Sequence, residues 1–124
     1  MIVPYVDTDF LMALIKPDDW LKEPAEKILG KYRGDLWTSS VAIVEVLMVA
    51  GRFSLNLENV VVSIYEMVRV PDMPRYIPLA AARFIRVKGM RTFDAFHAAS
   101  AGEDAIISSD RIFDKAGLRR IPLE

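Results

Sequence analysis

Short apolar runs alternate along the chain with longer segments in which apolar residues recur every three or four positions. The short runs predict buried strands at residues 2–6, 35–38, 68–70, 105–108 and 120–122. The longer segments predict helices at residues 10–15, 41–50, 57–67, 78–88, 93–101 and 111–116, and one from a cap at Asp18 or Asp19 to about residue 29. Pro4 fits poorly inside the first strand, because proline has no N–H to donate to a central ladder.

The predicted ends of these elements are marked by residues that favour them. Glycines at positions 30, 34, 51, 89, 102 and 117 are expected to end helices, and Ser39 or Ser40 and Thr92 are expected to cap them. Strands that alternate with helices predict an α/β fold, here a three-layer α/β/α sandwich with a short, mostly parallel sheet. No repeat or linker divides the sequence, so residues 1–124 are expected to form a single domain.

The composition excludes several kinds of catalytic and metal site. The sequence has no cysteine, which excludes a disulfide scaffold, thiol catalysis and a thiolate zinc site, and it has only one histidine, which excludes a histidine-rich zinc site. The longest apolar run is far too short to span a membrane, and the first residues do not resemble a signal peptide. We therefore expect a cytoplasmic protein without a membrane partner.

The net charge of −1 argues at first against nucleic acid as a partner. Sixteen lysines and arginines face seventeen acids. If five of those acids bind metal, twelve remain, and the rest of the protein carries a balance of +4. A near-neutral total can therefore hide a basic surface around an acidic metal site.

Two predicted strands end in an acid. Asp7 follows the first strand, and Asp110 follows the strand at residues 105–108. In open α/β sheets ligands gather outside the carboxyl ends of the strands, so both acids would face one crevice if these strands are parallel neighbours. For either residue alone, an ordinary helix cap explains the aspartate equally well.

Three further acids extend this set. Glu45 lies in a helix that is apolar on every side, which predicts burial, and no cation lies one turn away. Its partner is expected to be a metal ion; the alternatives are a distant arginine or lysine, or a position at the mouth of the site where Glu45 reaches water. Asp94 lies in the first turn of a helix, where the helix dipole alone favours an acid. Asp114 lies four residues after Asp110, on the same face if that stretch is helical.

An all-oxygen cluster favours Mg²⁺ or Mn²⁺ over zinc. Such clusters catalyse hydrolytic phosphoryl transfer, in which bound ions lower the pKa of a water and hold the phosphate. Without metal, repulsion between the carboxylates is expected to raise some of their pKa values. Asp7→Asn or Glu45→Gln is therefore predicted to abolish cleavage while leaving the metal-free fold intact or more stable.

The order of these motifs resembles that of the PIN-domain nucleases and, within them, the VapC-like toxins of toxin–antitoxin pairs. The resemblance rests on four segments that span nearly the whole chain: Val6-Asp7-Thr8-Asp9-Phe10-Leu11, Ser39-Ser40-Val41-Ala42-Ile43-Val44-Glu45-Val46, Thr92-Phe93-Asp94-Ala95-Phe96-His97-Ala98-Ala99 and Ser108-Ser109-Asp110-Arg111-Ile112-Phe113-Asp114. It implies four catalytic acids, which are Asp7, Glu45, Asp94 and Asp110, with Thr8 and Ser109 in support. Asp114 is a further candidate metal ligand.

The resemblance also implies an activity and partners. These are an endoribonuclease that leaves a 3′-hydroxyl and a 5′-phosphate, a homodimer, and an antitoxin whose segment blocks the groove. Whether the enzyme prefers RNA to DNA stays open, because metal–carboxylate chemistry needs no 2′-hydroxyl.

Other polar and aromatic residues have less specific interpretations. Basic residues recur at positions 83, 86, 88 and 91 before the third motif, and Arg91 among them is expected to contact substrate phosphate. Positions 115, 119 and 120 near the end form a second basic group. We interpret His97 as a buried structural histidine, although one turn from Asp94 it could also touch the substrate. Trp20 and Trp37 are expected in the core rather than as stacking platforms for bases, and exposed aromatic residues could instead serve the dimer or antitoxin surface.

Three alternatives remain at this stage. Asp7-Thr8-Asp9 also fits the opening motif of haloacid-dehalogenase-like phosphatases, although no catalytic lysine motif follows. The fold and chemistry could serve RNA processing without a toxin role. The domain could also have kept its acids and act only by binding a partner.

Overall fold

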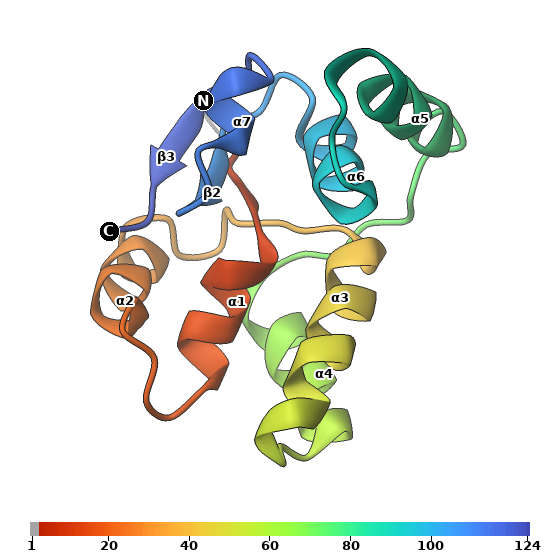
Figure 1. The fold of residues 1–124 in the computed structure, drawn as a ribbon. Helices are drawn as coiled ribbons and strands as arrows, with labels where there is room; N and C mark the ends of the chain where they lie inside the picture. Colours follow the sequence, from red (N-terminus) through yellow and green to blue (C-terminus); the bar gives the residue numbers. More distant parts are fainter. Residues whose placement is uncertain (1–2) are drawn as a thin grey trace.

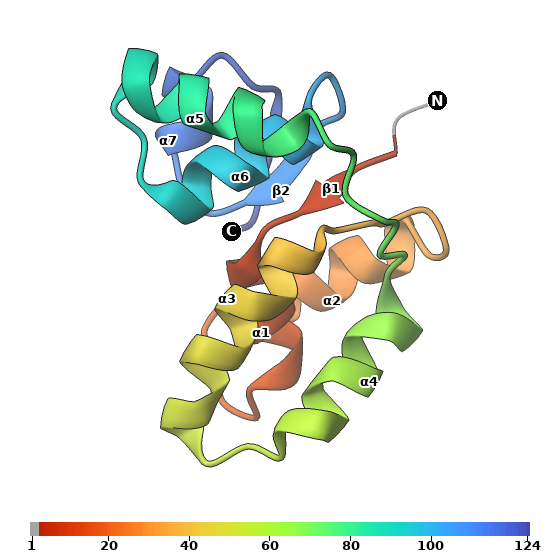
Figure 2. The same cartoon turned by 90° about the vertical axis from the view of Figure 1, so that its right-hand side faces the viewer.

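The computed structural model describes residues 3–124, in which three parallel strands form an open sheet with helices on both faces (Figures 1 and 2). The strand order is β1 (Tyr5–Val6), β2 (Ile106–Ser108), β3 (Arg120–Pro122). In the register, Val6 lies beside Ile107, and Ile107 beside Ile121. The first and last parts of the chain are therefore neighbours in the sheet. All three strands are parallel, and β1 leads directly into α1 (Thr8–Ile15).

Beyond β1, the sheet edge consists of single bridges. Trp37 pairs with Tyr5, and Arg69 pairs with Trp37, each in parallel. The strands predicted at residues 35–38 and 68–70 are therefore each reduced to one bridging residue. β1 is also shorter than predicted, because the ring nitrogen of Pro4 cannot join the ladder; Ile2, where that strand was expected to begin, lies outside the described residues.

Four helices cover one face of the sheet and three cover the other (Figure 2). The first group comprises α1, α2 (Lys22–Lys31), α3 (Ser40–Ala50) and α4 (Leu57–Met67), with a short 3₁₀ helix, η1 (Gly51–Phe53), between the last two. The second group comprises α5 (Ile77–Lys88), α6 (Thr92–Ala101) and α7 (Ile112–Lys115). This arrangement confirms the predicted α/β class and its helical layers.

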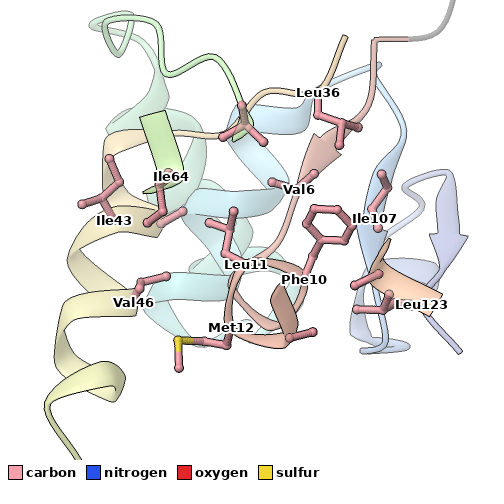
Figure 3. Packing of buried hydrophobic residues seen from close by; sticks show 14 of the residues in the cluster. Val6, Phe10, Leu11, Met12, Leu36, Ile43, Val46, Ile64, Ile107 and Leu123 are labelled. Atoms are coloured by element: carbon pink, nitrogen blue, oxygen red, sulfur yellow. The ribbon is translucent and has the colours of Figure 1, made fainter. Parts of the chain in front are cut away.

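Successive strand residues point into separate cores. Val6 and Ile107 pack with Phe10 and Leu11 against the first helix group (Figure 3). Tyr5 and Ile106 pack into the core of the second group. Because side chains alternate across a strand, both faces of β1 and β2 are buried, as expected of a parallel sheet between two helical layers.

Several helix boundaries differ by a few residues from the predictions. α2 begins at Lys22, because the carboxylate of Asp19 is used in a turn, where it accepts a hydrogen bond from the N–H of Leu21 at 2.9 Å. Gly30 lies inside α2 and does not end it. Thr92 is the first residue of α6, and Arg91 precedes it without a side-chain cap. Among residues 3–124, no helix is both long enough and apolar enough to cross a bilayer.

Candidate active site

Asp7 lies between β1 and α1, at the carboxyl end of the strand. Its backbone N–H donates to the carbonyl of Ile107 at 3.0 Å, which extends the pairing with β2. Its Oδ1 accepts a hydrogen bond from the N–H of Thr8 and its Oδ2 accepts one from the hydroxyl of Ser108, both at 2.7 Å. The side chain is buried and held from both sides, so Asp7 is both a helix cap and a fixed oxygen donor.

Glu45 reaches the same place from α3. Its Oε1 accepts a hydrogen bond from the hydroxyl of Thr8 and lies 2.7 Å from Nε2 of His97. The prediction that this helix is buried on every side was wrong, because Val44 and Met48 are 53% and 58% exposed. The expected lack of a local cation was correct. Within the described chain, the partner of Glu45 is a histidine of α6, 52 residues away.

His97 joins the acids to the interior. It is fully buried, and its Nδ1 lies 2.6 Å from the hydroxyl of Tyr5, which in turn lies 2.8 Å from the hydroxyl of Ser39. Its Nε2 also lies 3.4 Å from Oδ1 of Asp7. The predicted burial is confirmed, but His97 packs directly against two of the candidate acids. No local pattern in the sequence signals this contact, because Asp7, Glu45 and His97 come from three separate segments.

Asp110 and its neighbours complete the end of β2. The N–H of Asp110 donates to the hydroxyl of Ser108 at 2.9 Å, and the side chain of Asp110 is exposed. The N–H of Ser109 donates to Oδ2 of Asp9 at 2.8 Å, and the Ser109 hydroxyl bonds to the same oxygen. Asp9 was not among the predicted site residues. Its other oxygen is buried without a hydrogen-bond partner in the described part of the chain.

The remaining predicted residues lie at different distances from this cluster. Asp94, half-buried in the first turn of α6, faces the same cavity, and exposed Arg91 precedes it in the chain. Asp114 does not line the cavity; it is exposed and pairs with Arg120, whose Nε lies 3.1 Å from its Oδ1. The structure therefore brings together the four predicted catalytic acids, without Asp114.

These residues line a cavity of about 500 Å³. Its walls are formed by Asp7, Thr8, Asp9, Met12, Asp19, Trp20, Leu21, Glu45, Val49, Asp94, Ser109 and Asp110. Trp20 is 82% exposed here, so the prediction that it belongs to the core was wrong. Trp37 is half-buried against the second core, and its indole N–H donates to the carbonyl of Val3 at 3.1 Å.

Burial and neighbouring charges shift the pKa values of the residues in and beside the cavity. Burial, opposed in part by His97, raises the pKa of Asp7 to about 7, and burial also raises the pKa values of Asp9 and Asp94. Burial acts on Glu45 in the same direction, but hydrogen bonds from His97 and Thr8 outweigh it and lower its pKa. For His97, burial acts to lower the pKa, whereas Tyr5, Glu45 and Asp7 raise it to about 10. At neutral pH, His97 is therefore an imidazolium that partly neutralises the cluster.

The donor set fits a hard divalent cation. All the candidate ligands on the cavity wall are carboxylates, which suit Mg²⁺ and Mn²⁺. Oxygens of Asp7 and Glu45 and a nitrogen of His97 lie within 4.8 Å of one another. The unpartnered oxygen of Asp9 and the raised pKa of Asp7 both indicate a place where positive charge is missing. Because Nε2 of His97 is engaged with Glu45, the carboxylates are the better ligands.

Several solved structures share this architecture. The structure of DNA-bound VapBC from Salmonella typhimurium superposes with a TM-score of 0.76 and 16% identity over 100% of both chains. VapC20 from Mycobacterium tuberculosis, a toxin that cleaves the sarcin–ricin loop, gives 0.75 and 20% over 93% of this chain and 95% of that one. A toxin–antitoxin complex from Klebsiella pneumoniae gives 0.70 and 14% over 87% of each chain.

At these identities the likeness concerns the fold. No curated protein matches the sequence. The family model of the PIN domain, however, matches residues 5–118, a segment that begins in β1 and contains every acid of the cavity. The chain therefore belongs to the PIN domain family.

Proposed function

We propose that this protein is a Mg²⁺- or Mn²⁺-dependent endoribonuclease that acts as the toxin of a toxin–antitoxin pair. The observation that carries the proposal is the convergence of Asp7, Glu45, Asp94 and Asp110 on one cavity from four separate segments. Membership of the PIN family supports hydrolysis of nucleic acid, and the toxin–antitoxin complexes among the structural neighbours support the biological role.

The four acids would hold the metal. When bound, a divalent cation supplies Lewis acidity, which activates a water and balances the charge of the scissile phosphate. Thr8, Ser108 and Ser109 fix the acids by donating hydrogen bonds to Glu45, Asp7 and Asp9 respectively. The geometry supports Asp9 as the fifth carboxylate, in place of Asp114, whose partner is Arg120.

Arg91 is proposed to contact the substrate. It lies at the entry to α6, where its charge acts on Asp94 and lowers the pKa that burial and neighbouring Asp110 raise. An exposed guanidinium beside an acidic cavity can hold a phosphate that does not reach the metal. Contacts of this kind position the strand without reading its sequence.

We expect the purified protein to cleave an unstructured single-stranded RNA with Mn²⁺ or Mg²⁺ and to lose cleavage in EDTA, because without the cation nothing balances the charge of the phosphate beside the carboxylates. Gel analysis of 5′-labelled RNA measures the rate, and a DNA strand of the same sequence tests preference for RNA. Asp94→Asn, run beside the wild type, reveals contaminating nuclease. Cleavage that persists in EDTA, or that is equal in the variant, would refute the site.

The alternatives are less well supported. A phosphatase of the haloacid-dehalogenase type needs Asp7 as a nucleophile with a lysine beside it, but both oxygens of Asp7 accept hydrogen bonds and the described lining of the cavity contains no lysine. A binding module without activity leaves the unpartnered oxygen of Asp9 unexplained. RNA processing uses the same site, and a small antitoxin reading frame directly upstream of the gene would favour the toxin role.

We further propose a homodimer and an antitoxin as partners, with the cytoplasm as the compartment. Exposed apolar side chains support a protein interface: Val44 and Met48 on α3, and Leu79, 77% exposed, on α5. Figure 2 shows α3 and α5 on the same side of the molecule. Apolar surface of this kind on neighbouring elements is typical of interaction sites.

Leu79→Asp is expected to convert the dimer into a monomer, because a carboxylate buried in an apolar contact loses its hydration. Sedimentation equilibrium should then give 14.0 kDa for the variant and twice that mass for the wild type. Val62→Asp, which replaces an exposed valine of α4, is the matched control and should leave the mass unchanged. A monomeric wild type would refute the homodimer.

A further inference from the structure

The side chain of Trp20 is largely exposed, so it contributes little to the stability of the fold. It is 82% exposed and stands at the mouth of the acidic cavity, in the loop between α1 and α2. Indole has the largest ring system among the side chains, and exposing it forgoes the stabilisation that burial gives. A lone exposed aromatic is ordinary on a protein surface. What distinguishes Trp20 is the loop that holds it and the acidic cavity that it lines.

The loop that carries Trp20 is tied down on both sides of it. Asp19 pairs with Lys16 at 3.3 Å and accepts a hydrogen bond from the N–H of Leu21, whose side chain is buried. The ammonium of Lys22 donates to the carbonyl of Lys16 at 3.0 Å. These contacts fix the backbone before and after Trp20, so the loop holds the indole at the cavity.

The cavity is lined by two kinds of side chain. Carboxylates are one kind, and the apolar residues Met12, Leu21, Val49 and Trp20 are the other. These apolar residues are called the apolar wall. A nucleotide also combines two such parts, a charged phosphate and, joined to it through ribose, a flat base with aromatic faces. We propose that Trp20 and this apolar wall bind a nucleobase of the strand whose phosphate lies at the carboxylates.

This inference rests on the proposed nuclease function and adds a requirement to it. Every base offers an aromatic face, so stacking on Trp20 tolerates different sequences. A base in a duplex already stacks on both sides, and only an unpaired base can turn into the cavity. The protein therefore cuts RNA at unpaired nucleotides, where one base is held by Trp20.

Fluorescence tests the contact without cleavage. The chain has two tryptophans, and Trp37 is half-buried, so an added strand should quench mainly Trp20. An Asp94→Asn background keeps the strand intact, and Mg²⁺ in the buffer balances the charge between the carboxylates and the phosphate. Adding an unstructured RNA 12-mer, which is about as long as one single-strand binding site, should quench the emission. The same strand in a duplex should not.

Trp20→Ala should weaken binding of the single strand by about 5- to 150-fold, the range measured for loss of one stacked base. Trp20→Phe should recover much of the affinity, and Tyr65→Ala, which removes an exposed tyrosine of α4, should leave it unchanged. In the active protein, Trp20→Ala should raise KM with little change in kcat. This split follows because the base contact forms before the reaction.

The outcomes separate this inference from the nuclease proposal. Quenching and affinity loss without any cleavage by the wild type would support the base site and refute the enzyme. Metal-dependent cleavage with equal affinity and KM in Trp20→Ala would refute the base site and keep the enzyme. If Trp20→Ala instead abolishes binding of an antitoxin and leaves RNA binding unchanged, Trp20 is a protein contact and the base site is also refuted.

Discussion

Asp7→Asn is expected to reduce RNA cleavage on the order of 10³-fold or more and to stabilise the metal-free protein at pH 8. The first effect follows because Asp7 offers oxygens at the centre of the cavity. The second follows from linkage. The pKa of Asp7 is raised mainly by burial, from 3.8 to about 7, so the folded state holds this proton more tightly than the unfolded chain.

The sign of the pH effect is therefore fixed. Below pH 4 Asp7 is protonated in both states and costs nothing; between pH 4 and 7 the folded state loses stability, and above pH 7 the full penalty is present. A shift of three pKa units corresponds to at most about 4 kcal/mol. The attraction between Asp7 and His97, 3.4 Å apart, is also lost in the variant and makes the gain smaller.

Thermal unfolding in EDTA at pH 4.5 and pH 8 measures this difference. The Tm of Asp7→Asn should exceed that of the wild type at pH 8 and approach it at pH 4.5. Asp35→Asn, at an exposed position outside the cavity, should change neither Tm nor cleavage. Glu45→Gln should also abolish cleavage, but it should lower the Tm, which revises the expectation from the sequence, because His97 and Thr8 stabilise Glu45 as the anion. A lower Tm for Asp7→Asn at pH 8 would contradict the burial argument.

His97→Leu is expected to destabilise the metal-free protein by about 3–5 kcal/mol, the cost of removing one partner of a buried ion pair. Leucine fills a similar volume, so the loss is electrostatic. Glu45 loses a partner at 2.7 Å, and the hydroxyl of Tyr5 loses one at 2.6 Å. In Tm this is roughly 10–20 °C for a domain of this size.

The pH dependence identifies the cause. Burial acts to lower the pKa of His97, but Tyr5, Glu45 and Asp7 raise it from 6.5 to about 10. The stabilising contribution of His97 is therefore full below pH 6.5 and disappears as the pH rises through 10. The Tm difference between His97→Leu and wild type should therefore shrink from pH 6 to pH 10. Ser100→Ala, which removes a buried hydroxyl of α6 that has no hydrogen-bond partner among residues 3–124, is the control, and its effect on the Tm should not vary with pH. A Tm difference that does not vary with pH would indicate packing instead of charge.

Local signals in the sequence were sufficient where they were strong. The helix at residues 57–67 and the strand at 120–122 have the predicted bounds, because a periodic apolar pattern lies between clear end signals. The strands around Trp37 and Arg69 were predicted too long, since pairing there stops after a single bridge. Periodicity reports burial, but it does not report how many residues find a partner strand.

The candidate site was also predictable only in part, because local patterns do not report which distant segments meet. The strand-end rule placed Asp7 and Asp110 correctly at one edge of the sheet. The spacing argument for Asp114 required a helix that includes Asp110, but α7 begins at Ile112, so the two acids do not share a helical face. His97 depends on contacts with distant segments, and no local pattern reports those. Trp20 was placed in the core because of its residue type, which does not show that its loop leaves the indole exposed.

The sheet register has a consequence for the order in which this protein is made. Asp7 and Ser108, joined by a hydrogen bond, are 101 residues apart, and β1 pairs with β2 across almost the same interval. A ribosome must therefore release the chain as far as Asp110 before Asp7 can meet it. Closing a connection of this length costs entropy before the contacts reward it, so the cavity is expected to assemble late in folding. The acids of the cavity stay apart until β2 has left the ribosome.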